Sequence, residues 1–207
     1  MDRAAERHAL VDRLTDREDL DGDTTAAMRA VPRHLFVPEE KRGVAYEDTP
    51  LPIGEGQTIS APHMVAIMTG LLALDEGDEV LEIGTGCGYH AAVTAEVVDA
   101  EHVYSVEYHE RLAERARETL DRAGYSGVSV AAGDGKGGWP AHAPYDRAYL
   151  TCAAADFPQA VVDQVRPGGI LLAPLGKRRQ SLVRARKRDD GSLAREEHGY
   201  VRFVPLQ

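Results

Sequence analysis

Glu79-Val-Leu-Glu-Ile-Gly-Thr-Gly-Cys-Gly-Tyr89 is the stretch that decides the fold. Its apolar residues Val80, Leu81 and Ile83 predict a short buried strand of a parallel sheet. Three glycines then mark a tight turn, and the small residues of Tyr89–Val98 predict a helix. A strand, a glycine turn and a helix form the ligand-binding crevice of a doubly wound α/β fold. Backbone N–H groups and the helix N-terminus can approach a ligand closely there.

The spacing of these glycines distinguishes two classes of ligand. A dinucleotide fingerprint requires G-x-G-x-x-G, and counting from Gly84 and Gly86 puts its last glycine at Tyr89. The chain instead has acid-x-G-x-G-x-G, with Glu82 two residues before Gly84. This form resembles the first motif of class I S-adenosylmethionine methyltransferases. A simple strand-to-helix turn remains the alternative, because a glycine-rich turn alone is a weak signal.

Length and charge exclude several classes of protein. The 207 residues predict one domain, with a helical and loop extension over 1–75 and a cofactor-binding core with C-terminal strands over 76–207. The net charge is −10 and no cluster of Lys and Arg dominates the sequence, so no basic surface for nucleic acid is evident. No apolar run approaches the roughly eighteen residues of a membrane span, and the charged N-terminus is unlike a signal peptide. We expect a cytoplasmic monomer that binds neither nucleic acid nor membrane.

Two features of the composition add to this description. Cys87 and Cys152 are the only cysteines, and we expect both to be free thiols in a reducing compartment. The chain has four lysines among many acidic residues. This balance is similar to that of proteins from salt-accumulating archaea, and ordinary acidic solubility is the alternative.

The N-terminal third predicts packing elements followed by an ordered loop. Apolar spacing predicts a helix over 4–14, and Asp23 or Thr24 can cap a second helix over 25–31. The apolar segment 31–38 is expected to dock on the core. Prolines and glycines in 45–63 exclude a long helix or a central strand.

The end of that loop carries side-chain donors just before a predicted helix over 62–74. Gln57, Thr58 and Ser60 are these donors. Ser60 has two interpretations, a helix N-cap or a group of the active site. His63 on the first turn has no partner at metal-ligand spacing, so no metal site is expected.

The remaining strands place two carboxylates at strand ends. Glu107 follows the predicted strand 102–106, about twenty residues after the glycine turn, where an acid binds ribose hydroxyls. Asp134 follows strand 128–132 and can accept a hydrogen bond from an adenine amino group. Solvated strand-end carboxylates are the alternative. The other predicted elements are helices 111–120 and 158–165, strands 146–151 and 170–173, and an antiparallel pair formed by 181–187 and 200–204.

Together these segments resemble the protein-L-isoaspartate O-methyltransferases, and the likeness covers nearly the whole chain. The Ile-Gly-x-Gly-Gln-Thr-Ile-Ser loop is the specific part, because other methyltransferases share the glycine turn without it. The matching segments are Val31–Pro38, Tyr46–Ser60, Val80–Gly86, Gly133–Gly135, Ala143–Asp146, Pro167–Gly169 and Phe203–Leu206.

The resemblance implies an activity, a cofactor and a set of site residues. The enzyme would transfer the methyl group of S-adenosylmethionine to the α-carboxylate of L-isoaspartyl residues, and more weakly to D-aspartyl residues, in aged proteins. The methyl ester then collapses to a succinimide. Ser60 would be the active-site hydroxyl, and Cys87 stands where the family commonly has serine. The implied cofactor residues are Gln57, Thr58, Ile59, Ser60, Glu82, Gly84, Thr85, Gly86, Cys87, Glu107, Tyr108, Asp134 and Gly135.

This chemistry requires little acid–base help. An aspartyl carboxylate has a pKa near 3.9 and is already ionised at pH 7, so we expect no general base. Two alternatives remain open from the sequence. One is another methyltransferase, acting on tRNA or a small carboxylic acid. The other is a non-catalytic adaptor of the same fold that binds damaged proteins, although such a module should lack the two strand-end acids or carry a long extra domain.

Overall fold

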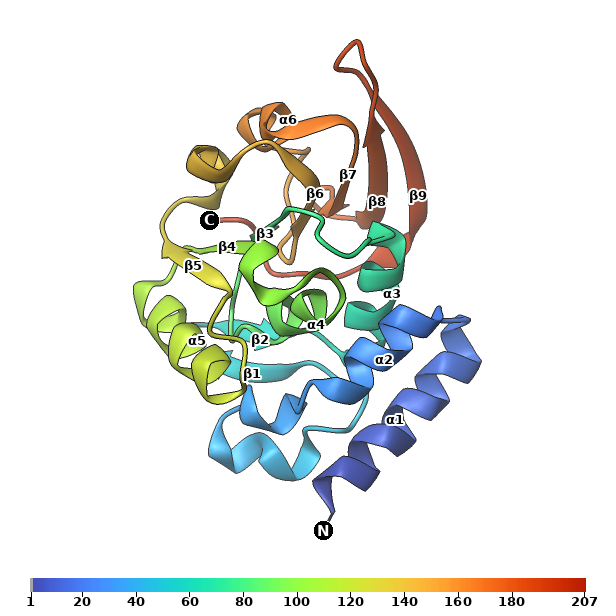
Figure 1. Ribbon diagram of the computed structural model, residues 1–207, viewed down its shortest axis with the longest axis vertical. Helices are drawn as coiled ribbons and strands as arrows, with labels where there is room; N and C mark the ends of the chain where they lie inside the picture. Colours follow the sequence, from blue (N-terminus) through green and yellow to red (C-terminus); the bar gives the residue numbers. More distant parts are fainter. Residues whose placement is uncertain (1) are drawn as a thin grey trace.

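A seven-stranded sheet forms the centre of the computed structural model, which describes residues 2–207. The strands are β3 Val80–Ile83, β4 Val103–Glu107, β5 Ser129–Ala132, β6 Tyr145–Leu150, β7 Val165–Leu175, β8 Gln180–Lys187 and β9 Leu193–Val201. Their order is β5-β4-β3-β6-β7-β8-β9, with the first five parallel and the last two antiparallel (Figure 1). The predicted doubly wound, mostly parallel sheet is confirmed.

The strand order creates a crevice beside β3. From β3 the chain moves outward through β4 to β5, then returns to β6 on the other side of β3. Ligands bind at such a reversal, outside the carboxyl ends of the strands. Ile83 pairs with Val106 on one side and with Leu150 on the other. The ends of three strands therefore meet at one edge of the sheet.

Six α-helices lie within residues 2–207, and none has the length and apolar character needed to cross a membrane. They are α1 Arg3–Glu18, α2 Gly22–Ala30, α3 Pro62–Leu72, α4 Tyr89–Val98, α5 Glu110–Arg122 and α6 Gln159–Gln164. The predicted N-cap of α2, Asp23 or Thr24, is wrong by two or three residues. Asp21 caps it, because its carboxylate accepts hydrogen bonds from both the backbone N–H and the hydroxyl of Thr24, at 2.6 and 3.0 Å.

The segment before α3, predicted as an ordered loop, contains a small hairpin. Strands β1 Leu51–Gly54 and β2 Gln57–Ile59 pair with each other and join no other strand. The prediction that 45–63 holds no central strand is therefore confirmed. Pro52 is tolerated in β1 because a strand with a single partner can lack one N–H without losing a hydrogen bond of the sheet.

The C-terminal antiparallel pair exists, but its second strand is not the predicted 200–204. Strand β9 begins at Leu193, directly after the polar turn that follows β8, and pairs antiparallel with β8 as far as Val201. Its residues are mostly exposed and polar because β9 is the edge strand of the sheet, so they carry no alternating apolar pattern. Residues 167–169, which lie between the predicted helix 158–165 and the predicted strand 170–173, are also part of β7, at the point where its register with β6 shifts.

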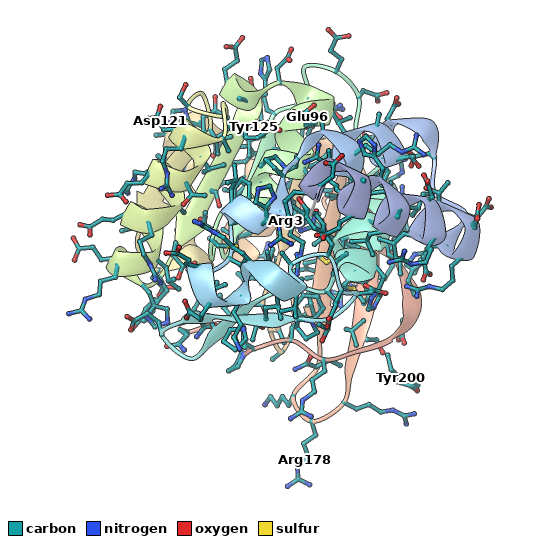
Figure 2. All side chains as sticks on the ribbon, turned by 90° about the horizontal axis from the view of Figure 1, so that it is seen from below. Arg3, Glu96, Asp121, Tyr125, Arg178 and Tyr200 are labelled. Atoms are coloured by element: carbon teal, nitrogen blue, oxygen red, sulfur yellow. The ribbon has the colours of Figure 1, made fainter. Side chains whose placement is uncertain are left out.

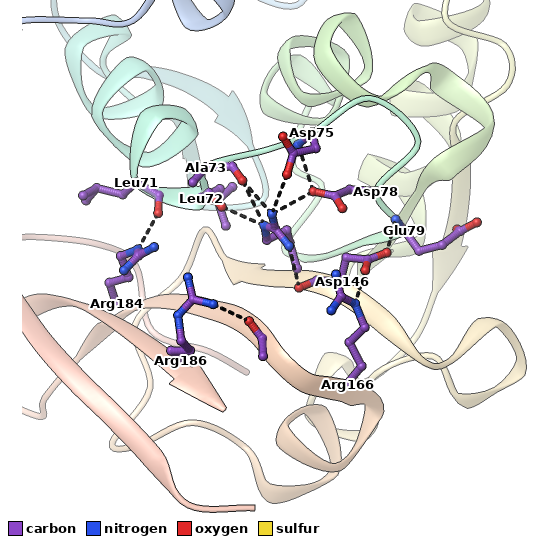
Figure 3. Close-up of polar contacts among 12 residues, drawn as sticks. Leu71, Leu72, Ala73, Asp75, Asp78, Glu79, Asp146, Arg166, Arg184 and Arg186 are labelled. Atoms are coloured by element: carbon purple, nitrogen blue, oxygen red, sulfur yellow. Dashed lines mark hydrogen bonds and ion pairs between the residues drawn. The ribbon is translucent and has the colours of Figure 1, made fainter. Parts of the chain in front are cut away.

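Two arginines from the sheet hold the C-terminal end of α3 (Figure 3). Arg147 on β6 donates to the carbonyls of Leu72 and Ala73 at 2.8 and 2.7 Å, and Arg184 on β8 donates to that of Leu71 at 2.8 Å. The last turn of α3 has no basic residue of its own, so these guanidinium groups satisfy its terminal carbonyls and dipole. Helix α3 is thereby fixed to the sheet, and so is the segment that leads into it.

Candidate active site

A cleft lies at the carboxyl ends of β3, β4 and β6, between the β1–β2 hairpin and the C-terminal tail. It gathers twelve of the thirteen residues proposed from the sequence, although these come from four separate segments of the chain. The twelve are Gln57, Thr58, Ile59, Ser60, Glu82, Gly84, Thr85, Gly86, Cys87, Glu107, Tyr108 and Gly135.

Asp134 is the proposed residue that lies outside this lining. Its side chain is exposed, and its carboxylate accepts a hydrogen bond from the backbone N–H of Lys136 at 2.9 Å. The ammonium group of Lys136 lies 3.6 Å from the same carboxylate. At this strand end Gly135 alone reaches the cleft wall, and the adenine contact of Asp134 stays a prediction.

The glycine turn brings the backbone against the cleft. Gly84 and Gly86 have φ of +101° and +56°, a region that L side chains rarely adopt. A Cβ at Gly84 would also collide with the hydroxyl of Thr151. That hydroxyl donates to the carbonyl of Gly84. Thr151, which also lines the cleft, therefore braces the turn at the carbonyl of Gly84.

Glu107 is a buried anchor of this turn. Glu107 is only 5 % exposed, so the alternative of a solvated strand-end carboxylate is wrong. One carboxylate oxygen accepts from the N–H of Gly86 at 2.8 Å, and the other accepts from the N–H of His109 at 2.9 Å. Each carboxylate oxygen retains capacity for a further hydrogen bond, and Glu107 lines the cleft.

Glu82 lies deeper, in a chain of buried hydroxyl groups. Its carboxyl group is hydrogen-bonded to the hydroxyls of Ser105 at 2.5 Å and of Tyr149 at 2.9 Å. The hydroxyl of Ser105 lies 2.5 Å from that of Thr85, in the glycine turn. Burial raises the pKa of Glu82 to about 8, so the group is mostly neutral at pH 7. The chain of hydroxyls links this neutral acid to the wall of the cleft.

Ser60 does not cap α3. The N-cap position is Ala61, and no side chain of the segment makes a cap hydrogen bond. Asp48 performs that task from the preceding loop, because its carboxylate accepts from the backbone N–H of His63 at 2.9 Å and lies 2.8 Å from Nδ1 of the same residue. The hydroxyl of Ser60 is thus left at the cleft surface.

Asp48 is itself held in its charged form. Burial alone would raise the pKa of this carboxyl, but hydrogen bonds from His63 and Arg17 outweigh burial and hold the pKa below its ordinary value. Arg17 donates to its second oxygen at 2.7 Å. Asp48 therefore connects α1 to the first turn of α3 and fixes the approach to Ser60.

Two cysteines and His90 in the cleft wall are neutral. Burial raises the pKa of Cys87 to about 11 and that of Cys152 to about 12, so both are thiols at pH 7. Burial lowers the pKa of His90 to about 3. Across residues 2–207, no three His, Cys, Asp or Glu side chains gather as a metal ion would require.

Sequence reasoning did not assign several residues that line the cleft. Thr151 ends the fourth predicted strand, which is the signal that could have identified it. The tail 204–207 lies against the cleft because Ala153 pairs with it, donating to the carbonyl of Val204 at 2.7 Å and accepting from the N–H of Leu206 at 2.8 Å. Such a return of the tail to the end of β6 has no local sequence signal.

Comparisons with known proteins agree on one family. The family model for protein-L-isoaspartate(D-aspartate) O-methyltransferase matches residues 5–207. Protein-L-isoaspartate O-methyltransferase 2 of Archaeoglobus fulgidus is 52% identical over 208 residues, covering 100% of this chain and 95% of that protein. The protein-L-isoaspartate O-methyltransferase of Methanothrix thermoacetophila is 54% identical, covering 87% of this chain and 85% of the relative. These relatives are archaeal, and adaptation to high salt stays a prediction.

Solved structures share the architecture. A protein-L-isoaspartate O-methyltransferase superposes with a TM-score of 0.88 at 30% identity, covering 97% of this chain, which spans 66% of that longer one. A Plasmodium falciparum structure in complex with S-adenosyl-L-homocysteine has a TM-score of 0.84 at 23% identity and covers 97% of this chain and 98% of its own, which shows the common fold. Since the family model spans almost every residue and relatives share about half of the sequence, the chain belongs to the protein-L-isoaspartate(D-aspartate) O-methyltransferase family.

Proposed function

We propose that this chain methylates the α-carboxylate of L-isoaspartyl residues, and more weakly of D-aspartyl residues, in damaged proteins. The observation that carries the proposal is the free hydroxyl of Ser60 at the cleft, with Asp48 acting as the helix cap in its place. A methyl ester formed there would leave the enzyme and collapse to a succinimide. The proposal also includes a monomeric enzyme in the cytoplasm.

The cleft fits S-adenosylmethionine. Gly84 and Gly86 offer backbone where any Cβ would be strained. Glu107 is fixed by two backbone N–H groups and keeps lone pairs for the ribose hydroxyls. Tyr108 presents a ring that is 53% exposed beside it. Ile83 and Val106 add apolar lining. These are the parts that a charged nucleoside with an apolar purine face requires.

The protein's contribution is to position the reactants and exclude water. S-adenosylmethionine supplies a methyl group on a sulfonium, which an ionised carboxylate can attack directly. Ser60 would donate one hydrogen bond to the substrate carboxylate and orient its second oxygen toward that methyl group. Glu82 is mostly neutral and fully hydrogen-bonded, so it takes no proton. Alignment alone can supply roughly 7–11 kcal/mol of the barrier, and the tail 204–207 helps to keep water out.

The first test compares two peptides that differ only in one linkage. Tritiated S-adenosylmethionine is incubated with an isoaspartyl peptide and with its normal aspartyl twin. We expect label only in the isoaspartyl peptide, as a base-labile ester. Equal labelling of both, or of neither, would reject the proposed substrate.

Replacing Ser60 with alanine is expected to lower kcat/KM about ten- to a hundredfold. One hydrogen bond to a charged group is worth about 1.5–3 kcal/mol. The melting temperature should hardly change, since Ser60 caps nothing. Ser60→Thr keeps a hydroxyl and should retain more activity than Ser60→Ala.

The control is Ser126→Ala, which removes an exposed hydroxyl from the loop before β5. It should behave as the wild type in both measurements. Wild-type kcat/KM in Ser60→Ala with a lowered melting temperature would mean that Ser60 only supports the fold.

A further inference from the structure

A group of unpaired cations borders the substrate side of the cleft, although the chain has a net charge of −10. We call Lys177, Arg178, Arg179 and Arg202 the cationic rim. The first three form the turn between β7 and β8, and Arg202 follows β9. All four are exposed. Arg184 of β8 and Arg195 of β9 have acidic partners, but within residues 2–207 none of the rim side chains forms an ion pair.

Two hollows connect the cationic rim to Ser60. The first adjoins the cofactor cleft and is lined by Thr58, Ser60 and His63 on one side and by Tyr200 and Arg202 on the other. The second continues from Tyr200 and Arg202 to Arg178 and Arg179. Because the hollows share Tyr200 and Arg202, one surface track leads from the active-site hydroxyl to the tip of the β7–β8 turn.

Tyr200 gives this track an apolar platform. It is 66% exposed, and the guanidinium carbon of Arg179 lies 3.7 Å from its ring centroid. Figure 2 shows Arg178 reaching outward from the turn, with Tyr200 on the neighbouring strand. Gln180 fixes the arrangement, since its amide bonds both the N–H and the carbonyl of Phe203, at 2.7 and 3.1 Å.

We propose that the cationic rim binds acidic side chains that flank the isoaspartyl residue in the substrate polypeptide. This inference rests on the proposed function. A chain of net charge −10 repels acidic partners over most of its surface. Four unpaired cations beside the track attract acidic segments locally. This attraction raises the rate at which such segments meet the enzyme and favours them over neutral or basic ones. The effect should fade in salt, because exposed charges are screened over about 10 Å at 0.1 M.

The test uses three isoaspartyl peptides that differ only in the residues flanking the damaged site, which are Glu, Gln or Lys. At low ionic strength the wild type should methylate the Glu peptide with a kcat/KM about three- to tenfold above that of the Gln peptide. The difference should appear in KM and shrink at 0.5 M KCl. The Lys peptide should be the poorest.

The deciding variant is Lys177→Gln/Arg178→Gln/Arg179→Gln. Its control, Arg13→Gln/Lys41→Gln/Arg122→Gln, makes the same charge change on α1, the turn 39–44 and α5. The rim variant should lose the preference for Glu and keep wild-type turnover of the Gln peptide, and the control should keep the preference.

Each other outcome counts against a specific statement. An unchanged ratio of Glu to Gln peptides in the rim variant, or the same loss in the control, would overturn the role of the rim. A single-stranded oligonucleotide that competes more strongly than the Glu peptide would assign the rim to nucleic acid instead. Failure of the wild type to methylate any isoaspartyl peptide would reject the proposed function, and a fluorescently labelled Glu peptide would then still report rim binding by anisotropy.

Discussion

Replacing Glu107 with glutamine is expected to weaken S-adenosylmethionine binding by about 1.5–3 kcal/mol for each charged hydrogen bond lost to the ribose, or roughly ten- to a hundredfold per bond. The structure shows why glutamine is a better probe than alanine. Both carboxylate oxygens already accept backbone N–H groups, from Gly86 and His109. Alanine would leave two buried donors unpaired at about 1–3 kcal/mol each, whereas glutamine keeps one acceptor oxygen and leaves only one of them unpaired.

Affinity is measured by calorimetric titration of S-adenosylmethionine, at a temperature where circular dichroism shows each variant folded. Glu110→Gln serves as the matched control, because it removes an exposed carboxylate three residues away on α5. It should bind as the wild type does. If Glu107→Gln also keeps wild-type affinity, the ribose lies elsewhere and Glu107 serves only to brace the glycine turn.

The segments predicted most accurately are those whose structure is decided locally. Strand β3 and helix α4 begin and end where the sequence placed them, because a fully buried strand, a glycine turn and a helix of small residues each carry their own signal. Part of the proposed lining of the cleft follows from the same signals. The parallel topology, which was itself predictable, places the glycine turn beside Glu107. Segment 57–60 belongs to a hairpin outside this sheet, so its place in the cleft does not follow from that topology.

Other features depended on partners distant in the sequence. Asp48 caps α3 by binding the N–H of His63, 15 residues later in the sequence, whereas the local pattern pointed to Ser60. Strand β9 is an exposed edge strand whose polar residues carry no alternating pattern. Arg147 meets Leu72 and Ala73 across 74–75 residues of sequence. Each of these features depends on tertiary contacts, which the secondary-structure propensity of a local segment does not predict.

The pH dependence of stability is expected to change most when Glu82 is replaced with glutamine. Burial raises the pKa of Glu82 from 4.5 to about 8 in the folded chain. Because the folded-state pKa is the higher one, the folded state binds the proton more tightly. The stability contributed by this proton is fully present below about pH 4.5 and is lost as pH rises to about 8.

The interval between those two pKa values corresponds to about 5 kcal/mol at about 1.4 kcal/mol per unit, which is an upper bound because the buried network can relax. Glutamine keeps the shape of the side chain and has no charge to bury. The free energy of unfolding, measured by urea titration at each pH, should therefore fall less steeply between pH 5 and 8 in Glu82→Gln. Glu110→Gln is again the control and should follow the wild type. Parallel curves for Glu82→Gln and the wild type would mean that Glu82 is ionised in the folded chain.

The protonation state of Glu82 should also affect cofactor binding in the cleft. Glu82 is linked through Ser105 to the hydroxyl of Thr85, and the charge of Glu107 lies close enough to disfavour ionisation of Glu82. Above about pH 8 an ionised Glu82 would need both hydroxyls of its network as donors, and Ser105 could no longer donate to Thr85. We expect S-adenosylmethionine affinity to fall in the wild type above that pH and to stay level in Glu82→Gln. A fall of equal size in both proteins would place the titrating group outside this network.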